Sequence, residues 1–194
     1  MRKLHWIFFS LLAQPLVLLS GCGGQETPDV PEAEAPPPAQ EAPPPEEEES
    51  GPIYITFEAA DLEGNPVSQE VFTQSKLTMV NVWATYCNPC LREMPGLGEL
   101  AADYDPSEFQ IIGVVSDVRE GADLSLVKSL VQETGADYLH LLANDSLNQA
   151  FLAGVTNVPT TFFFDGEGAY LGGVVGTAEK SAWEELIHEL LEGQ

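Results

Sequence analysis

Two cysteines spaced like a working dithiol stand in the middle of the chain. Cys87 and Cys90 end the stretch VNVWATYCNPC, with two residues between them. The apolar run 77–84 before them predicts a buried strand, and we expect a helix from about Asn88 to Tyr104. A sulfur at the N-terminus of a helix faces free backbone N–H groups and the positive end of the helix dipole. Both features stabilise a thiolate, so this spacing predicts thiol chemistry.

The two sulfurs have different expected tasks. Because the thiolate is the nucleophile, a lowered pKa makes Cys87 the attacking thiol. Cys90 lies almost one helical turn further on, faces the same side and can form a disulfide with Cys87. We expect it to be the more buried thiol, which resolves a mixed disulfide. Pro89 falls in the first helical turn, where its missing N–H costs nothing.

A metal site and a purely structural disulfide fit the cysteine pair less well. A structural zinc site uses four ligands, normally with a second Cys/His pair. His140 and His188 stand singly in other predicted elements, so we expect no metal and an ordinary structural environment for each. A disulfide that closes so small a loop stabilises little. A Cys-x-x-Cys motif within a strand–helix–strand pattern is typical of a redox-active dithiol.

The third cysteine, Cys22, follows a sequence with the layout of a secretory signal. Arg2 and Lys3 precede the apolar stretch 6–20, and LSGC then ends at Cys22. LSGC resembles a bacterial lipobox, in which cleavage occurs before the cysteine and its sulfur carries lipid. We therefore predict a lipoprotein signal peptide over residues 1–21 and lipidation of Cys22. An ordinary signal peptide and an N-terminal transmembrane anchor are the alternatives.

The next segment is expected to be a tether. Residues 22–51 are dominated by proline and glutamate, so the segment cannot bury enough apolar surface to fold. We expect a disordered, extended linker here and a folded domain over residues 52–194. The formal net charge of −24 argues against nucleic-acid binding and favours a monomer that stays apart by self-repulsion.

The folded part alternates predicted strands and helices. Strands are expected at Ile53–Phe57, Leu77–Ala84, Phe109–Ser116, Tyr138–Leu142, Pro159–Asp165 and Ala169–Gly176. Helices are expected at about 88–104, 123–134 and 146–154 and over the last residues. This order predicts an α/β fold with a central mixed sheet, mostly parallel with a C-terminal antiparallel hairpin, and helices on both faces.

Two motifs resemble the TlpA/ResA-like branch of the thioredoxin fold. They are VNVWATYCNPCLREMPGL and NVPTTFFFDGEGAYLGGVVG, and the resemblance extends over about residues 53–191. It implies a thioredoxin-like fold and a membrane-anchored thiol-disulfide oxidoreductase on the extracytoplasmic side. It also implies reduction of disulfides in exported proteins, with apocytochrome c as a plausible substrate and a membrane thiol-electron carrier as the electron source. No cofactor beyond the redox-active Cys87–Cys90 pair is expected.

The resemblance assigns structural and substrate-binding roles to several residues. Pro159 matches the loop proline that is cis in this fold and packs beside the dithiol. Val158, just before it, is expected to offer backbone hydrogen bonds to a bound partner chain. Trp83 matches the aromatic residue before the active-site turn and should pack next to the dithiol. Pro95 matches a proline that kinks the first helix.

Three further positions bear on the chemistry. Glu93 matches an acidic residue of the ResA-like branch; if partly buried, its pKa rises and it can shuttle a proton for the thiols. The alternative is a solvated glutamate favoured by the helix dipole. Tyr86 stands where family members often carry tryptophan, and Asn88-Pro89 stands where thioredoxin has Gly-Pro. The dipeptide between the cysteines tunes thiolate stability and hence the redox potential.

Two other functions remain as alternatives. A peroxiredoxin-like thiol peroxidase would place its threonine in a T-x-x-C pattern, whereas Thr85 is only two positions before Cys87. A copper chaperone on the same fold would need C-x-x-x-C and a histidine near the proline strand. The motif here is C-x-x-C, and NVPTT contains no histidine.

Overall fold

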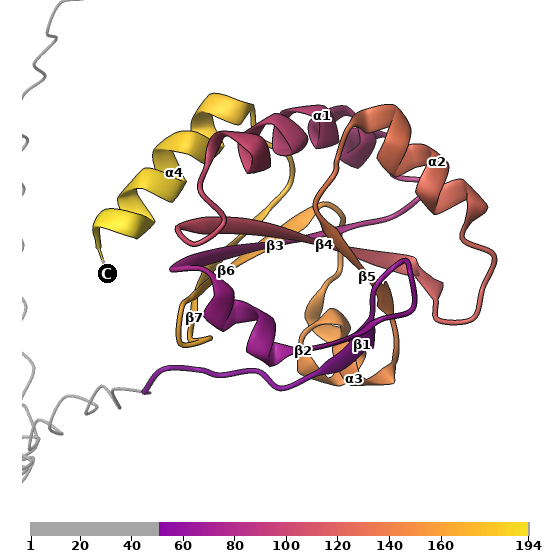
Figure 1. Ribbon diagram of the computed structural model, residues 1–194, viewed down its shortest axis with the longest axis horizontal. Coiled ribbons are helices and arrows are strands. Elements are labelled where there is room, and N and C mark those ends of the chain that lie inside the picture. The colour runs from indigo at the N-terminus through magenta and orange to yellow at the C-terminus, as the bar shows by residue number, and fades with distance from the viewer. Residues whose placement is uncertain (1–50, 194) are drawn as a thin grey trace, which may run out of the picture. The chain divides into compact units, whose positions relative to one another are not determined.

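The computed structural model describes residues 51–193, which form a mixed sheet with helices on both faces (Figure 1). The five strands of this sheet run in the order β5-β4-β3-β6-β7. Their bounds are β3 (Leu77–Trp83), β4 (Phe109–Arg119), β5 (Leu139–Ala143), β6 (Thr160–Asp165) and β7 (Tyr170–Val175). β3, β4 and β5 are parallel, while β6 and β7 are antiparallel to their neighbours. The predicted thioredoxin-like fold with its C-terminal hairpin is therefore confirmed.

The two faces of the sheet are covered differently. Three long helices lie on one face: α1 (Asn88–Asp103), α2 (Ser125–Thr134) and α4 (Lys180–Glu192) (Figure 1). The other face carries the short helix α3 (Asp145–Ala150), the 3₁₀ helices η1 (Gln69–Gln74) and η2 (Leu152–Gly154), and a hairpin of β1 (Glu58–Ala60) and β2 (Pro66–Ser68). Helices were expected on both faces, and the structure confirms this, although α3 is the only α-helix on the second face among the described residues.

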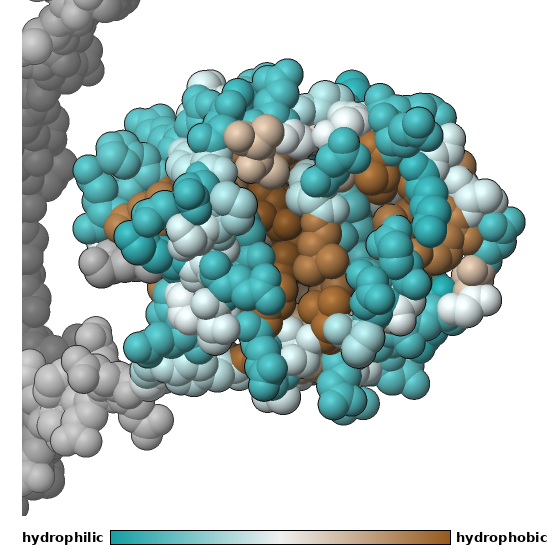
Figure 2. Space-filling view, viewed as in Figure 1, coloured by the Kyte–Doolittle hydropathy of each residue, from teal (hydrophilic) through white to brown (hydrophobic). Residues whose placement is uncertain are grey.

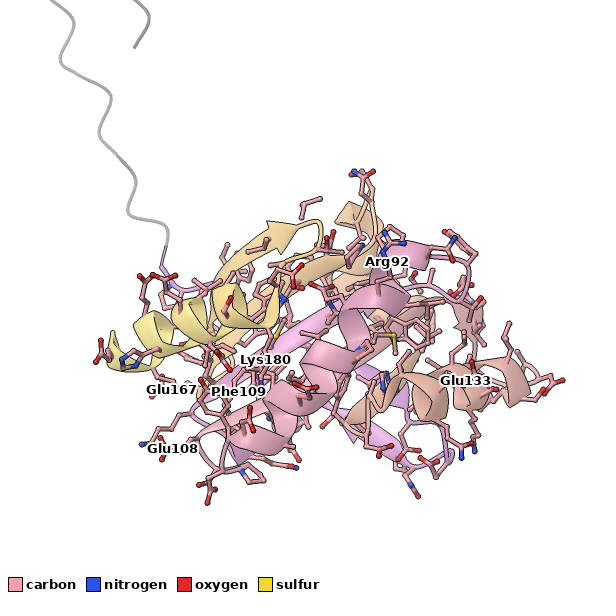
Figure 3. All side chains as sticks on the ribbon, turned by 90° about the horizontal axis from the view of Figure 1, so that it is seen from above. Arg92, Glu108, Phe109, Glu133, Glu167 and Lys180 are labelled. Carbon is pink, nitrogen blue, oxygen red and sulfur yellow. A yellow bond between two sulfur atoms is a disulfide. The ribbon has the colours of Figure 1, made fainter. Side chains whose placement is uncertain are left out.

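Strand β3 is the centre of the fold and leads directly to the cysteines. All seven of its residues are buried, as expected for a strand with neighbours on both sides and elements on both faces. Helix α1 lies across the sheet between α2, which carries Glu133, and α4, which carries Lys180 (Figure 3). Gly98 permits the close approach of α1 to the end of α2, because a Cβ there would lie 2.1 Å from the carbonyl oxygen of Gly135. The N-terminus of α1 is thus fixed against the sheet and its neighbouring helices.

The surface of the domain is mostly polar on the side shown in Figure 2, with apolar side chains visible between the outer polar residues. The largest fully buried side chains include Trp83, Phe109, Phe163 and Trp183. They lie on strands of the sheet and on α4, so the core lies between the sheet and its helices. This core supports the strand and the helix that position the dithiol.

The expectation of a strand at Ile53–Phe57 is wrong. The first regular strand begins at Glu58 and pairs with Pro66–Ser68 in a separate two-stranded sheet. The preceding segment meets the main sheet only locally, through the Tyr54–Ala169 bridge and the bond from the Tyr170 N–H to the Ile53 carbonyl. The alternation correctly indicates a buried face, since Phe57 and Ala59 are buried. The segment continues into the β1–β2 hairpin, however, and does not form a strand of the five-stranded sheet.

Three sequence predictions lie outside the described residues: the signal peptide at 1–21, lipidation of Cys22, and all but the last residue of the tether at 22–51. Within residues 51–193, no helix has the length and apolar character needed to cross a membrane.

Candidate active site

Cys87 caps the N-terminus of α1, as the sequence predicted. The Cys90 N–H donates to the Cys87 Sγ at 3.2 Å, and the Leu91 N–H donates to the Cys87 carbonyl at 3.1 Å. Pro89 lies in the first turn of this helix, directly after Asn88. A backbone donor therefore already points at this sulfur, and the positive end of the helix dipole adds to its effect. Such a position favours negative charge on the Cys87 sulfur once the pair is reduced.

The two cysteines form a disulfide and differ in exposure. Cys90 is 1% exposed and Cys87 is 5% exposed, so the predicted order of burial is confirmed. A partner chain can reach Cys87 more readily, whereas Cys90, in the first turn of α1, is more deeply buried. This is the arrangement that an attacking and a resolving thiol require.

The loop before β6 lies directly against the reactive sulfur. The Val158–Pro159 peptide bond is cis, as the resemblance implied. The carbonyl oxygen of Val158 lies 3.6 Å from the Cys87 Sγ. This loop therefore borders the reactive sulfur, and the substrate-binding role of Val158 stays a prediction.

A carboxylate from the end of β4 fixes the turn that precedes Cys87. The Thr85 N–H donates to both carboxylate oxygens of Asp117, at 3.0 and 3.2 Å, and the Thr85 hydroxyl donates to Oδ2 at 2.5 Å. The Cys87 N–H closes the turn by donating to the Ala84 carbonyl at 3.0 Å. Asp117 could not be identified from local sequence patterns, because it lies 32 positions from Thr85.

Trp83 packs in the same buried cluster as both cysteines, as predicted. Its indole Nε1–H donates to the His140 Nδ1 at 3.3 Å, and the His140 Nε2 is 2.9 Å from the Ala136 carbonyl. These partners fix the tautomer, because Nδ1 must accept and Nε2 must donate. Burial lowers the pKa of His140 to about 4, so its ring is neutral. His140 lies in a strand, as predicted, but its contact with Trp83 was not expected.

Gly113 makes room for this imidazole. A Cβ at Gly113 would lie 2.1 Å from the His140 Nδ1. The two residues face each other in the register of β4 and β5. The absence of a side chain at Gly113 is therefore a condition for the Trp83–His140 hydrogen bond.

Glu93 is buried on the other side of α1, toward α4. Its Oε1 accepts from the indole Nε1–H of Trp183 and from the backbone N–H of Ala178, both at 2.9 Å. Its Oε2 has no hydrogen-bond partner among the described residues, and neither has the buried hydroxyl of Tyr138. Burial raises the pKa of Glu93, although the two hydrogen bonds oppose this shift. The expected burial and upward shift are present, whereas the proton-shuttle role stays a prediction.

The remaining candidate residues are placed as follows. Tyr86 is 74% exposed beside Cys87, and Pro95 lies inside α1. His188 is on the exposed surface of α4, where its Nε2 is 3.4 Å from a carboxylate oxygen of Glu192. Among residues 51–193, no group of three or more His, Cys, Asp or Glu side chains is placed to hold a metal ion.

Comparisons with known proteins support a thiol-disulfide oxidoreductase. The model of the AhpC/TSA family matches residues 51–169. Thiol-disulfide oxidoreductase ResA from Bacillus thuringiensis subsp. konkukian is 30% identical over 135 residues, which cover 69% of this chain and 74% of that protein. Thiol:disulfide interchange protein DsbE from Escherichia coli K12 is 33% identical over 137 residues, which cover 70% of this chain and 69% of that protein.

A solved structure has the same architecture. The thiol:disulfide interchange protein of the thioredoxin family from Chlorobium tepidum TLS matches with a TM-score of 0.63 and 25% identity. The match covers 72% of this chain and 97% of that one. The similarity thus extends over essentially a whole domain of this kind.

Proposed function

The chain belongs to the AhpC/TSA family and is a TlpA/ResA-like protein-disulfide oxidoreductase; from this premise we propose that it reduces disulfides in exported proteins while held at a membrane by lipid on Cys22. The observation that carries the proposal is the position of the Cys87 sulfur. It lies at the start of α1, accepts the Cys90 N–H at 3.2 Å, and faces the Val158 carbonyl at 3.6 Å.

In this reaction the two cysteines supply the electrons and the substrate disulfide receives them. In the reduced protein, the Cys87 thiolate attacks one sulfur of a substrate disulfide, which forms a mixed disulfide and releases the other substrate sulfur as a thiolate that takes up a proton. The Cys90 sulfur, after loss of its proton, attacks the Cys87 sulfur and releases the second substrate thiol. Two electrons pass from the dithiol to the substrate, and the Cys87–Cys90 disulfide remains.

The residues around the dithiol have different proposed roles in this reaction. Asp117 holds the turn before Cys87 through its bonds with Thr85. Glu93, whose pKa is raised by burial, is the proposed group that takes the proton from Cys90 and returns it during the reverse step. Trp83 packs behind both sulfurs. An external dithiol, proposed to be a membrane thiol-electron carrier, regenerates the reduced pair.

The proposals for location and substrate are supported by the sequence rather than by the site. The lipobox-like LSGC and the acidic, proline-rich residues that follow support attachment by lipid and a tethered domain outside the cytoplasm. Apocytochrome c, which the family resemblance implies, is our proposed substrate within the class of exported proteins.

Reduction of insulin by dithiothreitol tests the activity. The full chain should accelerate the reaction, and Cys87→Ser should abolish the acceleration. Cys90→Ser should instead accumulate a mixed disulfide through Cys87 with exported proteins in intact cells. Peroxide consumption or stoichiometric copper binding without insulin reduction would favour one of the two alternative functions.

The reduction potential of the Cys87–Cys90 couple tests the direction. A value near thioredoxin's, about −270 mV, supports a reductant, whereas a value near about −120 mV would make the protein an oxidant.

A further inference from the structure

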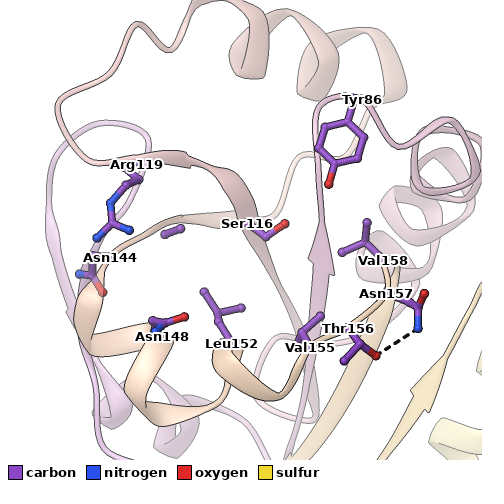
Figure 4. Close-up of a pocket in the computed structure, with 11 residues that line it drawn as sticks. Tyr86, Ser116, Arg119, Asn144, Asn148, Leu152, Val155, Thr156, Asn157 and Val158 are labelled. Carbon is purple, nitrogen blue, oxygen red and sulfur yellow. Dashed lines mark hydrogen bonds between the residues drawn. The ribbon is translucent and has the colours of Figure 1, made fainter.

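A small polar cavity opens beside the reactive sulfur. Its volume is about 250 Å³. Tyr86, next to Cys87, and Val158, whose carbonyl is 3.6 Å from the Cys87 Sγ, form part of its wall (Figure 4). Pockets for independent small ligands usually measure about 300–1,000 Å³. A cavity below that range, at the edge of a protein-disulfide site, is suited to one side chain of an incoming chain.

The wall opposite Tyr86 comes from elements far away in the sequence. Asn148 lies on α3, Leu152 on η2, and Thr156 and Asn157 on the loop that leads to the cis proline (Figure 4). None of these four side chains takes part in the thiol chemistry itself, so a role for them would lie in binding the substrate. None of these four residues was identified by the sequence analysis as part of the site.

The lining offers free hydrogen-bonding groups of both kinds. The Asn157 Nδ2 donates to the Thr156 Oγ1 at 3.1 Å, which leaves the Asn157 Oδ1 free as an acceptor and the Thr156 hydroxyl hydrogen free as a donor. The Asn148 side chain has no hydrogen-bond partner among the described residues. By contrast, the Asn144 amide is fully engaged with Glu58, Glu120 and the Leu147 N–H.

The lining carries one charged side chain, and that charge is already paired. Arg119 is the only charged side chain in its lining, and it is paired with Asp145. A cationic side chain would meet this guanidinium and find no carboxylate in the lining. An acidic side chain would have to compete with Asp145 for this guanidinium and would enter against a chain of net charge −24. An aliphatic side chain would leave the amide and hydroxyl groups unpaired.

We propose that this cavity is a specificity subsite that takes an uncharged amide or hydroxyl side chain of the substrate, from a residue close to the substrate cysteine. The inference rests on the proposed function, because the occupant reaches the cavity only when its cysteine is at Cys87. Asn148 and Asn157 pair with the side chain, and Leu152 contacts its apolar stem. The residues that select the substrate are therefore different from the two cysteines that react with it.

Disulfide-bonded peptides test the subsite on the full-length, reduced chain. The position on each side of the peptide cysteine is varied in turn among Gln, Leu, Glu and Lys, and kcat/KM for reduction is measured. On one side of the cysteine, the Gln peptide should be reduced about tenfold faster than the Leu, Glu and Lys peptides, since the lining then makes one or two additional hydrogen bonds. Equal rates for all four residues on both sides would overturn the inference.

Two variants locate the effect. Asn148→Leu should reduce the preference for Gln over Leu to about twofold or less, because it removes an amide from the lining. Gln149→Leu is the matched control; it changes the next exposed residue of α3, which does not line the cavity, and should keep the full preference. A preference that survives Asn148→Leu, or disappears in Gln149→Leu, would contradict the assignment. Failure to reduce any peptide would instead contradict the proposed function.

Discussion

The disulfide separates two regions that are built in opposite ways. The buried side, defined here as Trp83, His140, Glu93 and Trp183, consists of side chains that are 0–8% exposed and joined by specific hydrogen bonds. The open side, defined as Tyr86, Asn148, Thr156 and Asn157, is solvent-exposed and retains free polar groups. The packing and hydrogen bonds of the buried side stabilise the fold around the two sulfurs. The free polar groups of the open side can select the substrate chain that reaches Cys87. Changes on the buried side should therefore alter stability, while changes on the open side should alter substrate preference.

The largest expected effect is that of Gly113→Ala on the buried side. The added methyl group would lie 2.1 Å from the His140 Nδ1, and overpacking of this kind costs about 1–3 kcal/mol, occasionally more. We expect a loss of about 3 kcal/mol in the free energy of unfolding, measured by denaturant titration. In a His140→Ala background the same substitution should cost much less. Equal costs in both backgrounds would show that His140 is not the obstacle.

The second effect is a dependence of stability on pH through His140. Its pKa is about 4 in the fold, below its ordinary value of about 6.5 in the unfolded chain. The unfolded chain therefore binds more protons between these values, and the stability present above pH 6.5 is lost as the pH falls to about 4, by about 3 kcal/mol.

His140→Phe provides the comparison for this effect. The variant should lose this part of the acid dependence, while the carboxylates common to both proteins still titrate. Parallel stability curves for the two proteins between pH 6.5 and 4 would contradict a buried neutral imidazole.

Substitutions of Glu93 should give the next largest effect on stability. They also separate its role as a hydrogen-bond acceptor from its proposed role in proton transfer. Glu93→Ala leaves the Trp183 indole and the Ala178 N–H without their acceptor, at about 2 kcal/mol of stability. Glu93→Gln keeps an acceptor oxygen and removes the ionisable group, so it should be neutral or stabilising at pH 7. Burial raises the pKa of Glu93, so the carboxyl group disfavours folding as it ionises with rising pH. If the proton-shuttle role is correct, the Gln variant should still lose most of its insulin reductase activity.

The smallest effect on stability is expected at Tyr86, on the open side. It is 74% exposed, and surface substitutions usually change stability by less than about 0.5 kcal/mol. Tyr86→Ala should leave thermal unfolding unchanged and lower kcat/KM for peptide disulfides several-fold. A marked fall in the unfolding temperature would show that Tyr86 on the open side also stabilises the fold, and would contradict the distinction between a stabilising buried side and a substrate-selecting open side.

The sequence predicted the features that are encoded within short stretches. Cys87, Cys90 and Pro89 lie in one helical turn, and the apolar residues of β3 stand next to them, so strand, helix N-terminus and dithiol could be inferred together. The resemblance added the cis bond at Pro159. The error at Ile53–Phe57 arose because alternation identifies a face but not a strand's partner.

Contacts between distant residues could not be predicted in this way. Trp83 and His140 are 57 positions apart, and Asp117 and Thr85 are 32 apart. Asp117 and Thr85 meet through the register of the neighbouring strands β3 and β4, and the contact between Trp83 and His140 spans three parallel strands, β3, β4 and β5. No local pattern specifies these registers. Asn148 and Asn157 resemble ordinary polar residues in the sequence. They become a candidate subsite only where α3 and the loop before β6 meet beside Cys87.

The pH dependence of alkylation of the fully reduced chain shows whether the start of α1 stabilises the Cys87 thiolate. With iodoacetamide and peptide mapping by mass spectrometry, Cys87 should react first. Its rate should rise to a plateau at a pH below the value of about 8.5 that is typical of free cysteine. If Cys90 reacts first, or if Cys87 follows the profile of free cysteine, the start of α1 does not stabilise the attacking thiolate, and the account is wrong.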